Sequence, residues 1–432
     1  MALKIAIVGG GSAYAPGLIN AFIQNRDVFS GAKIVLMDIA GEELNIVASL
    51  SRKLAENSQA DITISATRNQ SEAIEGANFV LSTFRQGGFQ ARYYDESIPL
   101  MYGVVGQETI GPGGFFFAMR TLPVIQSILN DIKKYAPEAV LINYTNPTQI
   151  VSEAVKHFSS IECISICDQT QADQKKILEA MEMQNACVLL SSIGFNHATW
   201  SVKFEIDGEN GIDVMNRHLD TVLERQDVDN RVKRQFLLAN EYNRLPNSYL
   251  QYYYYKEETL SEAIEKRKTR AEVIMESLPG YYKHFKEQSE VNQPKLSHVR
   301  GGSVFGDMAV EVIKGLVLQD GSIHTLNIQN KNALPDFSKD RIVEVPARLD
   351  EKGVEPLEQP HLPSEVLGLL YMLGEYQWLA ANAIWNGDRK SLIHALASNP
   401  LVLSLSLAGK LYEHILPLIR SYIPNQFLSR WE

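Results

Sequence analysis

The sequence predicts an α/β fold in which a doubly wound parallel sheet is followed by a mixed α+β, mostly helical half. Short apolar runs typical of buried parallel strands alternate with helical patterns through about residue 200. The first run leads directly into three glycines, Gly9–Gly11. Beyond residue 200 the pattern changes to one alternating strand and long helical segments. We therefore expect two domains, residues 1–200 and 201–432, packed together with the site between them.

The predicted elements follow in order along the chain. Apolar runs predict strands over residues 3–8, 33–37, 62–64, 79–83, 139–143 and 163–166, and alternation predicts another over 201–206. Helical spacing predicts helices after the first glycines, at about 41–57, 211–240 and 256–290, and through the last 70 residues. Strands that alternate with helices form right-handed crossovers, so the first six runs should build one parallel sheet.

Composition narrows the classes of protein. The 432 residues carry a formal charge of −10, which argues against a nucleic-acid partner or an anionic membrane surface. The three cysteines, Cys163, Cys167 and Cys187, are too few for a disulfide framework and favour a reducing cytoplasm. No apolar run approaches the roughly 20 residues that span a bilayer. We expect a soluble, cytoplasmic protein.

The glycine turn predicts a nucleotide site. Gly9, Gly10, Gly11 and Ser12 follow the first strand, where backbone amides and a helix N-terminus can hold a pyrophosphate. Asp38 ends the second strand, where an acid would bind ribose hydroxyls and favour NAD over NADP. Tyr14 stands where the full fingerprint has its third glycine, and a strand-turn-helix without ligand is the alternative.

A cysteine and a histidine predict a metal site. Cys167 follows the strand 163–166, and His197 follows a second strand-like run that ends at Gly194. A thiolate and an imidazole suit a divalent transition metal. Two ligands are too few for a structural zinc site, so water and substrate oxygens would complete an open, catalytic one. A buried thiol and a core histidine are the alternative.

Polar residues also follow other predicted strands. Arg92 lies in a glycine-containing loop and could pair with a phosphate, or be an exposed arginine in a solvated ion pair. Asn146 could bind a sugar hydroxyl, or cap the helix after it. One tyrosine of the aromatic run 249–255 could act as a base beside a cation, although most of the run should be core.

Together these stretches resemble glycoside hydrolase family 4, the NAD- and metal-dependent 6-phospho-glycosidases. The resemblance covers about residues 3–310 and rests on residues 8–12, 92 with 95–100, 106–109, 111–114, 143–147, 167–168, 196–197, 246–250, 269–273 and 300–303. It implies a Rossmann-like sheet similar to that of lactate and malate dehydrogenases. It also implies hydrolysis of a phosphorylated disaccharide or glycoside by oxidation at C3, loss of the C2 proton, elimination and addition of water.

The resemblance also implies roles for individual residues. Cys167 and His197 would hold Mn²⁺ or a similar ion, and NAD would bind at the glycine turn. Tyr249 would remove the C2 proton, and Asp168 would protonate the leaving oxygen. Asn146 would contact the substrate, whereas Arg92 and Arg270 would lie near its phosphate. A homodimer or homotetramer is expected.

Some features depart from the family pattern. Asp168 after Cys167 is similar to the phospho-α-glucosidases, which favours the α anomer slightly, whereas residues 300–303 are closer to the β members. Gln169-Thr170 stands where the family has another residue and a proline. A glycosidase for another 6-substituted or acidic sugar, a plain NAD-dependent 2-hydroxy-acid dehydrogenase and a non-catalytic sugar-phosphate sensor are the alternatives.

Overall fold

The computed structural model describes residues 3–297, 300 and 306–432. Within them, one sheet contains twelve strands in the order β3-β2-β1-β4-β5-β6-β10-β11-β7-β8-β9, and β12 pairs with β11. The first six strands are parallel, as predicted. They are β1 (Lys4–Val8), β2 (Ala32–Met37), β3 (Ile62–Thr67), β4 (Phe79–Ser82), β5 (Val140–Asn143) and β6 (Cys163–Ser165).

The other half of the sheet is antiparallel. A long hairpin of β7 (Val188–Phe195) and β8 (Ala198–Ile206) is joined to β6 through two strands from much later in the chain. These are β10 (Ser322–Gln329), which meets β6, and β11 (Ile342–Asp350), which meets β7. The short strands β9 (Glu209–Asn210) and β12 (Gly353–Pro356) complete the sheet.

Helices cover both faces of the sheet and bury separate apolar clusters against it. The helices that build the site are α1 (Ala15–Gln24), α5 (Gly88–Met101), α7 (Thr148–Phe158), α8 (Gln169–Ala180), α10 (Asn230–Tyr242), α12 (Lys256–Glu265) and α13 (Arg270–Glu290). The remaining ones are α2 (Arg26–Phe29), α3 (Gly41–Asn57), α4 (Gln70–Ile74), α6 (Pro112–Tyr135), α9 (Gly211–Glu224), α11 (Gln251–Tyr254), α14 (Asp307–Leu318), α15 (Ser364–Asn386), α16 (Arg389–Ala397), α17 (Leu405–Ile419) and α18 (Asn425–Trp431).

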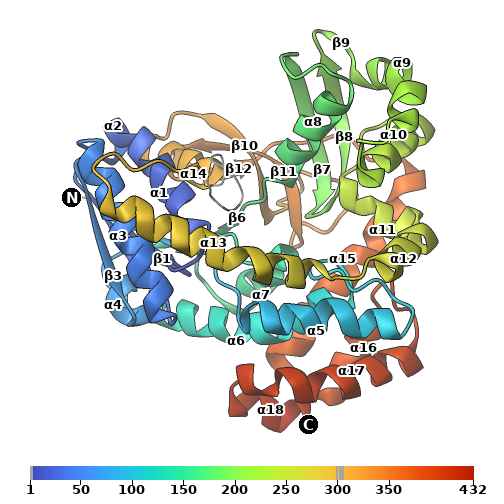
Figure 1. Cartoon of the computed structure of the whole chain (residues 1–432). Coiled ribbons are helices and arrows are strands. Elements are labelled where there is room, and N and C mark those ends of the chain that lie inside the picture. The colour runs from blue at the N-terminus through green and yellow to red at the C-terminus, as the bar shows by residue number, and fades with distance from the viewer. Residues whose placement is uncertain (1–2, 298–299, 301–305) are drawn as a thin grey trace.

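Helix α13 extends across both halves of the molecule. It runs across the molecule from the tyrosine-rich segment to the first βα units, as Figure 1 shows in yellow. It packs against α5 and α3, and Tyr282 donates a hydrogen bond of 2.9 Å to the carbonyl of Gly11. The N-terminus of α13 therefore lies near the tyrosine-rich segment, while its middle covers the glycine turn.

The two long helical segments predicted after residue 210 are helical, and each is divided by a break. The segment 211–240 contains two helices, because the chain breaks at Arg225 and restarts where Asp229 caps α10 by accepting a hydrogen bond from the Arg231 amide. The segment 256–290 is likewise divided into α12 and α13 by residues 266–269. Helical spacing continues across both breaks, so periodicity alone hides them. The strands β10–β12 and the helices α5 and α6 had not been predicted.

Candidate active site

The glycine turn after β1 has the backbone that a nucleotide site requires. The amides of Gly9 and Gly10 both donate to the carbonyl of Met37, at 2.9 and 2.8 Å. Gly9 has a φ of +98°, and a Cβ there would lie 2.6 Å from the backbone of Thr83. Only glycine fits this position, which leads the chain past β4 into the N-terminus of α1. Such a turn leaves space for a pyrophosphate at the N-terminus of α1.

Asp38 lies beside this turn, at the end of β2. Its Oδ2 accepts from the amide of Gly11 at 3.0 Å, and its Oδ1 accepts from the amide of Ala40 at 3.1 Å. Burial raises the pKa of Asp38, although these amides oppose the change. The carboxylate is thus fixed where the ribose of a dinucleotide lies in folds of this kind.

A cavity of about 540 Å³ brings almost all predicted site residues together. It runs from the glycine turn to the carboxyl ends of β5 and β6, where ligands bind in open α/β sheets. Gly10 does not line it. The predicted residues that do are Gly9, Gly11, Ser12, Asp38, Arg92, Asn146, Cys167, Asp168, His197, Tyr249 and Arg270.

Cys167 and His197 form a pair in this cavity. The distance from the Cys167 Sγ to the His197 Nε2 is 3.4 Å. Two donors bound to one ion at about 2.3 and 2.1 Å, at an angle between about 90° and 110°, lie about 3.1 to 3.6 Å apart. His197 has a φ of +62° in the tight turn between β7 and β8, which aims its ring at the thiol. The donor set therefore fits a single divalent ion.

The protonation of this pair is set by burial. Burial raises the pKa of the Cys167 thiol well above its usual range, and Glu344 and Asp168 add to this effect. Burial lowers the pKa of His197 to about 4, so the imidazole is neutral near pH 7, as a metal ligand must be. Among the described residues no group of three or more His, Cys, Asp or Glu side chains could hold an ion. Additional ligands would be water or substrate oxygens.

Tyr249 lies against the pair. It belongs to a 3₁₀ turn, Ser248–Leu250, and its ring stacks on the His197 imidazole with centroids 4.0 Å apart. The guanidinium of Arg231 lies 5.3 Å from the centroid of the same ring. Burial and the neighbouring Tyr252 raise the pKa of Tyr249, whereas Arg231 lowers it. Arg231 is a cation of the kind that a tyrosine base needs beside it.

The turn that carries Tyr249 is anchored by a buried carboxylate on α8. Asp173 Oδ2 accepts from the amide of Ser248 at 2.8 Å, and its Oδ1 accepts from Gln169 Nε2 at 2.6 Å. Arg231 Nη2 lies 3.9 Å from Asp173 Oδ1. Gln169, the departure from the family pattern noted above, thus contributes to the support of Tyr249.

Asp168 and Asn146 lie on the cavity wall. Burial raises the pKa of Asp168, which suits a carboxyl group that donates a proton. Asn146 Oδ1 accepts from Thr148 at the start of α7, with its amide at 3.3 Å and its hydroxyl at 2.9 Å. The N-cap position of α7 is Pro147, so Asn146 supports the start of the helix from one residue earlier, and it lines the cavity as well.

Arg92 is bound within a buried cluster of charges. Its Nε lies 2.6 Å from Glu96 and its Nη1 lies 3.4 Å from Glu108, which Arg85 contacts at 2.7 Å. Burial alone would raise the pKa of Glu108, but the two arginines outweigh it and hold the pKa at about 2. The solvated-arginine alternative for Arg92 does not hold, because the side chain is buried.

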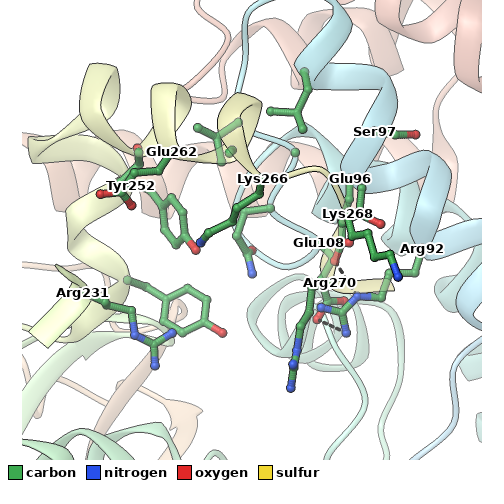
Figure 2. Close-up of a pocket in the computed structure, with 18 of the residues that line it drawn as sticks. Arg92, Glu96, Ser97, Glu108, Arg231, Tyr252, Glu262, Lys266, Lys268 and Arg270 are labelled. Atoms are coloured by element: carbon green, nitrogen blue, oxygen red, sulfur yellow. Dashed lines mark hydrogen bonds and ion pairs between the residues drawn. The ribbon is translucent and has the colours of Figure 1, made fainter. Parts of the chain in front are cut away.

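Arg270 is the first residue of α13 and lines the cavity from above. The helix begins with a capping box of Thr269 and Glu272, and Glu96 accepts from the Ala271 amide at 2.8 Å. Figure 2 shows Arg92, Glu96, Glu108 and Arg270 around this corner. Arg300 stacks on the rings of Tyr14 and Phe89 at 4.5 and 4.6 Å, whereas Gly301, Gly302 and Ser303 lie outside the described residues.

The sequence analysis assigned no role to three residues of this site: Glu108, Asp173 and Arg231. Glu108 lies in the Gly106–Thr109 stretch that supports the family resemblance, so a signal for it was present. Asp173 and Arg231 stand alone on helices, and their importance depends on partners from other segments.

The fold is that of the nucleotide-binding α/β dehydrogenases. Malate dehydrogenase from Plasmodium falciparum superposes with a TM-score of 0.53 at 11% identity, covering 89% of this chain and 99% of that chain. The chain belongs to the family 4 glycosyl hydrolases, whose model matches residues 4–183 and whose C-terminal domain model matches residues 192–402.

Named relatives of the chain extend over its whole length. A probable 6-phospho-β-glucosidase from Bacillus subtilis is 32% identical over 100% of this chain and 99% of the relative. A 6-phospho-β-glucosidase from Escherichia coli is 30% identical over 98% and 96%. A phospho-α-glucosidase from Clostridium acetobutylicum is 27% identical over 97% and 98%. The structure of the Thermotoga maritima 6-phospho-β-glucosidase with NAD and glucose-6-phosphate superposes with a TM-score of 0.84 at 26% identity, covering 98% and 99%.

None of the helices in the described ranges is long and apolar enough to cross a membrane.

Proposed function

We propose that this protein is an NAD- and divalent-metal-dependent 6-phospho-glucosidase. The observation that carries the proposal is the single cavity in which the glycine turn, the Cys167–His197 pair and Tyr249 meet. Membership of family 4 and the named relatives support the same activity and the same cofactors. A phosphorylated disaccharide or another 6-phosphoglucoside is the substrate.

The glycine turn and Asp38 would hold NAD, and Cys167 with His197 would hold Mn²⁺ or a similar ion. When bound, these groups would supply a hydride acceptor for C3 of the sugar and a Lewis acid for the resulting ketone, which makes the C2 proton acidic. NAD is regenerated within each turnover, so the net reaction is hydrolysis.

The chain's own residues then move protons. Tyr249 takes the C2 proton; burial raises its pKa, and the contact with Arg231 opposes that rise in the direction a base requires. Burial raises the pKa of Asp168, which favours the protonated form that would donate to the departing glycosidic oxygen. Arg92, Asn146 and Arg270 contact the sugar and its phosphate. Arg92 keeps its geometry through Glu96 and Glu108, which fixes the direction in which its guanidinium can bind.

Paired nitrophenyl 6-phosphoglucosides of both anomers test this activity, with and without NAD⁺ and Mn²⁺. We expect hydrolysis of one anomer only when both cofactors are present, and Cys167–Asp168 favours the α anomer. Stoichiometric accumulation of NADH would instead indicate the 2-hydroxy-acid dehydrogenase. Absence of cleavage for both anomers would contradict the proposal.

A second experiment addresses the base. Tyr249→Phe should abolish exchange of the C2 proton with deuterated solvent while binding of NAD is retained. Tyr255→Phe is the matched control, because Tyr255 lines neither this cavity nor the larger one beside it. Undiminished exchange in the Tyr249 variant would remove this residue from the mechanism.

We also propose a homodimer or homotetramer that works in the cytoplasm. The sparse cysteines support this location, and light scattering of the purified protein would measure the assembly.

A further inference from the structure

A second, larger cavity opens beside the catalytic one. Its volume is about 860 Å³, at the upper end of the range for small-molecule sites. Five residues line both cavities, so the two are neighbours with a shared wall: Arg92, Glu108, Gln169, Tyr249 and Arg270. A glycoside bound with its C2 at Tyr249 would extend its leaving group from this wall. We call this larger space the outer cavity.

The outer cavity is rich in positive charge. A basic segment, Lys266–Arg267–Lys268, forms the link between α12 and α13, and Arg231 extends into the same space from α10 (Figure 2). Lys176 adds another cation. The protein as a whole has a formal charge of −10, so the local concentration of cations in the outer cavity is opposite in sign to the net charge of the chain.

Most of the acids that line the outer cavity are already engaged. Glu96 and Glu108 are paired with Arg92, and Glu262 with Arg234. Glu272 serves the cap of α13. By contrast, no ion pair within 4.0 Å is found for Lys176, Lys266 or Arg267 in the described part of the chain. Among the described acids, Arg231 has one ion-pair partner within 4.0 Å, Asp173 at 3.9 Å.

The sugar phosphate does not account for these cations. The residues assigned to it, Arg92 and Arg270, lie on the shared wall. Lys266, Arg267 and Arg231 line the outer cavity and not the catalytic one, although Arg231 also lies over the Tyr249 ring at the shared wall. Clustered like charges repel one another, and an anion placed among them relieves the repulsion.

We propose that the outer cavity binds the leaving group of the substrate and selects leaving groups with a negative charge, such as a carboxylate, through Lys266, Arg267 and Arg231. This inference rests on the proposed 6-phospho-glucosidase activity and adds a substrate class to it: 6-phosphoglucosides of acidic aglycones. Lys266 and Arg267 come from the link between α12 and α13, and Arg231 comes from α10, so two segments that line the same space can offer charge-assisted hydrogen bonds to a carboxylate.

Two isosteric substrates test the proposal: the 4-carboxyphenyl and the 4-carbamoylphenyl 6-phosphoglucoside, of the anomer that the protein cleaves. They differ in charge and hardly in shape. We expect the wild-type protein, with NAD⁺ and Mn²⁺, to show a kcat/KM at least about tenfold higher for the carboxylate, since two or three exposed charge-assisted contacts each contribute about a factor of three. In the double variant Lys266→Gln/Arg267→Gln the ratio should fall toward one.

Lys286→Gln is the matched control, because Lys286 is an exposed cation on α13 that does not line the cavity. It should keep the wild-type ratio. A wild-type ratio near one, or a ratio that the double variant does not change, would overturn the proposal. Equal losses for both substrates would also overturn it, because the cations would then act on the phosphate common to both. Failure of the wild-type protein to cleave either substrate would instead contradict the activity itself.

Discussion

Asp173 offers a direct test of how the position of Tyr249 is maintained. The substitution Asp173→Asn keeps the size of the side chain but replaces one carboxylate oxygen by an NH₂ group. That group would face either the Ser248 amide or the Gln169 side chain, and both are donors. One of the two hydrogen bonds must therefore be lost, and the Ser248–Leu250 turn loses a contact to α8.

The expected effect on stability is small, for a reason that the structure supplies. Burial raises the pKa of Asp173, so the ionised carboxylate has a desolvation cost in the folded state. A hydrogen bond to a charged acceptor contributes about 1.5–3 kcal/mol, and removal of the buried charge offsets most of that loss. We expect the free energy of unfolding to change by less than about 1 kcal/mol.

The expected effect on catalysis is large. A displacement of about 1 Å in a reacting group can lower the rate by about a hundredfold. We therefore expect kcat of Asp173→Asn to fall between about tenfold and a hundredfold, with KM for the phosphoglucoside nearly unchanged. Exchange of the C2 proton with deuterated solvent should fall in parallel, because the proton transfer itself is impaired.

Steady-state kinetics, C2 exchange and urea denaturation measure the three quantities. Asp220→Asn, an exposed aspartate on α9, is the control and should behave like the wild-type protein. If kcat of Asp173→Asn stays within twofold of the wild-type value, the anchoring role is refuted. A loss of stability of several kcal/mol would also refute the reasoning.

Three other substitutions test the site. Glu108→Gln should lower the free energy of unfolding by about 3 kcal/mol at pH 7, because the pKa of Glu108 falls from 4.5 to about 2 on folding. This stabilisation is present above pH 4.5 and is lost as the pH falls from 4.5 to 2. Urea denaturation at pH 3.5 should therefore show a smaller difference between the variant and the wild-type protein. Cys167→Ser should weaken Mn²⁺ binding by at least about tenfold in calorimetry, whereas the exposed Cys187→Ser should not. Gly9→Ala should lower the free energy of unfolding by at least about 2 kcal/mol and abolish NAD binding. Gly368→Ala is the control and should change neither quantity, because a Cβ there meets open space.

Local patterns in the sequence predict the parallel half of the fold well. The central strands are short apolar runs, and parallel strands buried on both faces carry that signal in their own residues, whereas the edge strand β3 alternates between buried and exposed residues. The antiparallel strands β10 and β11 were missed because they join β6 and β7 from more than 130 residues away. Such pairing leaves no local trace beyond modest alternation.

Helix boundaries failed for a related reason. The sequence does indicate the break before α13, because Thr269 and Glu272 are the two partners of a capping box. That stretch had been noted only as part of the family resemblance. A search for caps inside each long helical segment would have divided 256–290 correctly, and Asp229 would have served the same purpose for 211–240.

The candidate site was predicted where its residues follow strands. Cys167 and Asp38 come directly after predicted strands and Asn146 follows one by three residues, so topology alone places them at one edge of the sheet. Asp173 and Arg231 lie inside helices that lack such a marker. Their contribution arises from distances of 3.9 Å to each other and 5.3 Å from Arg231 to Tyr249, which only the folded chain defines.

The order of strands has a consequence for how the protein is made. Asn327 of β10 pairs with Ser165, two residues before Cys167, and Glu344 of β11 pairs with Gly194 and accepts a hydrogen bond from Asn196. Until residues 322–350 have left the ribosome, the strands β10 and β11 that lie between β6 and β7 are missing. The thiol and the imidazole can therefore acquire their final spacing only late in translation, and a nascent chain of 300 residues would carry every proposed metal ligand without a metal site.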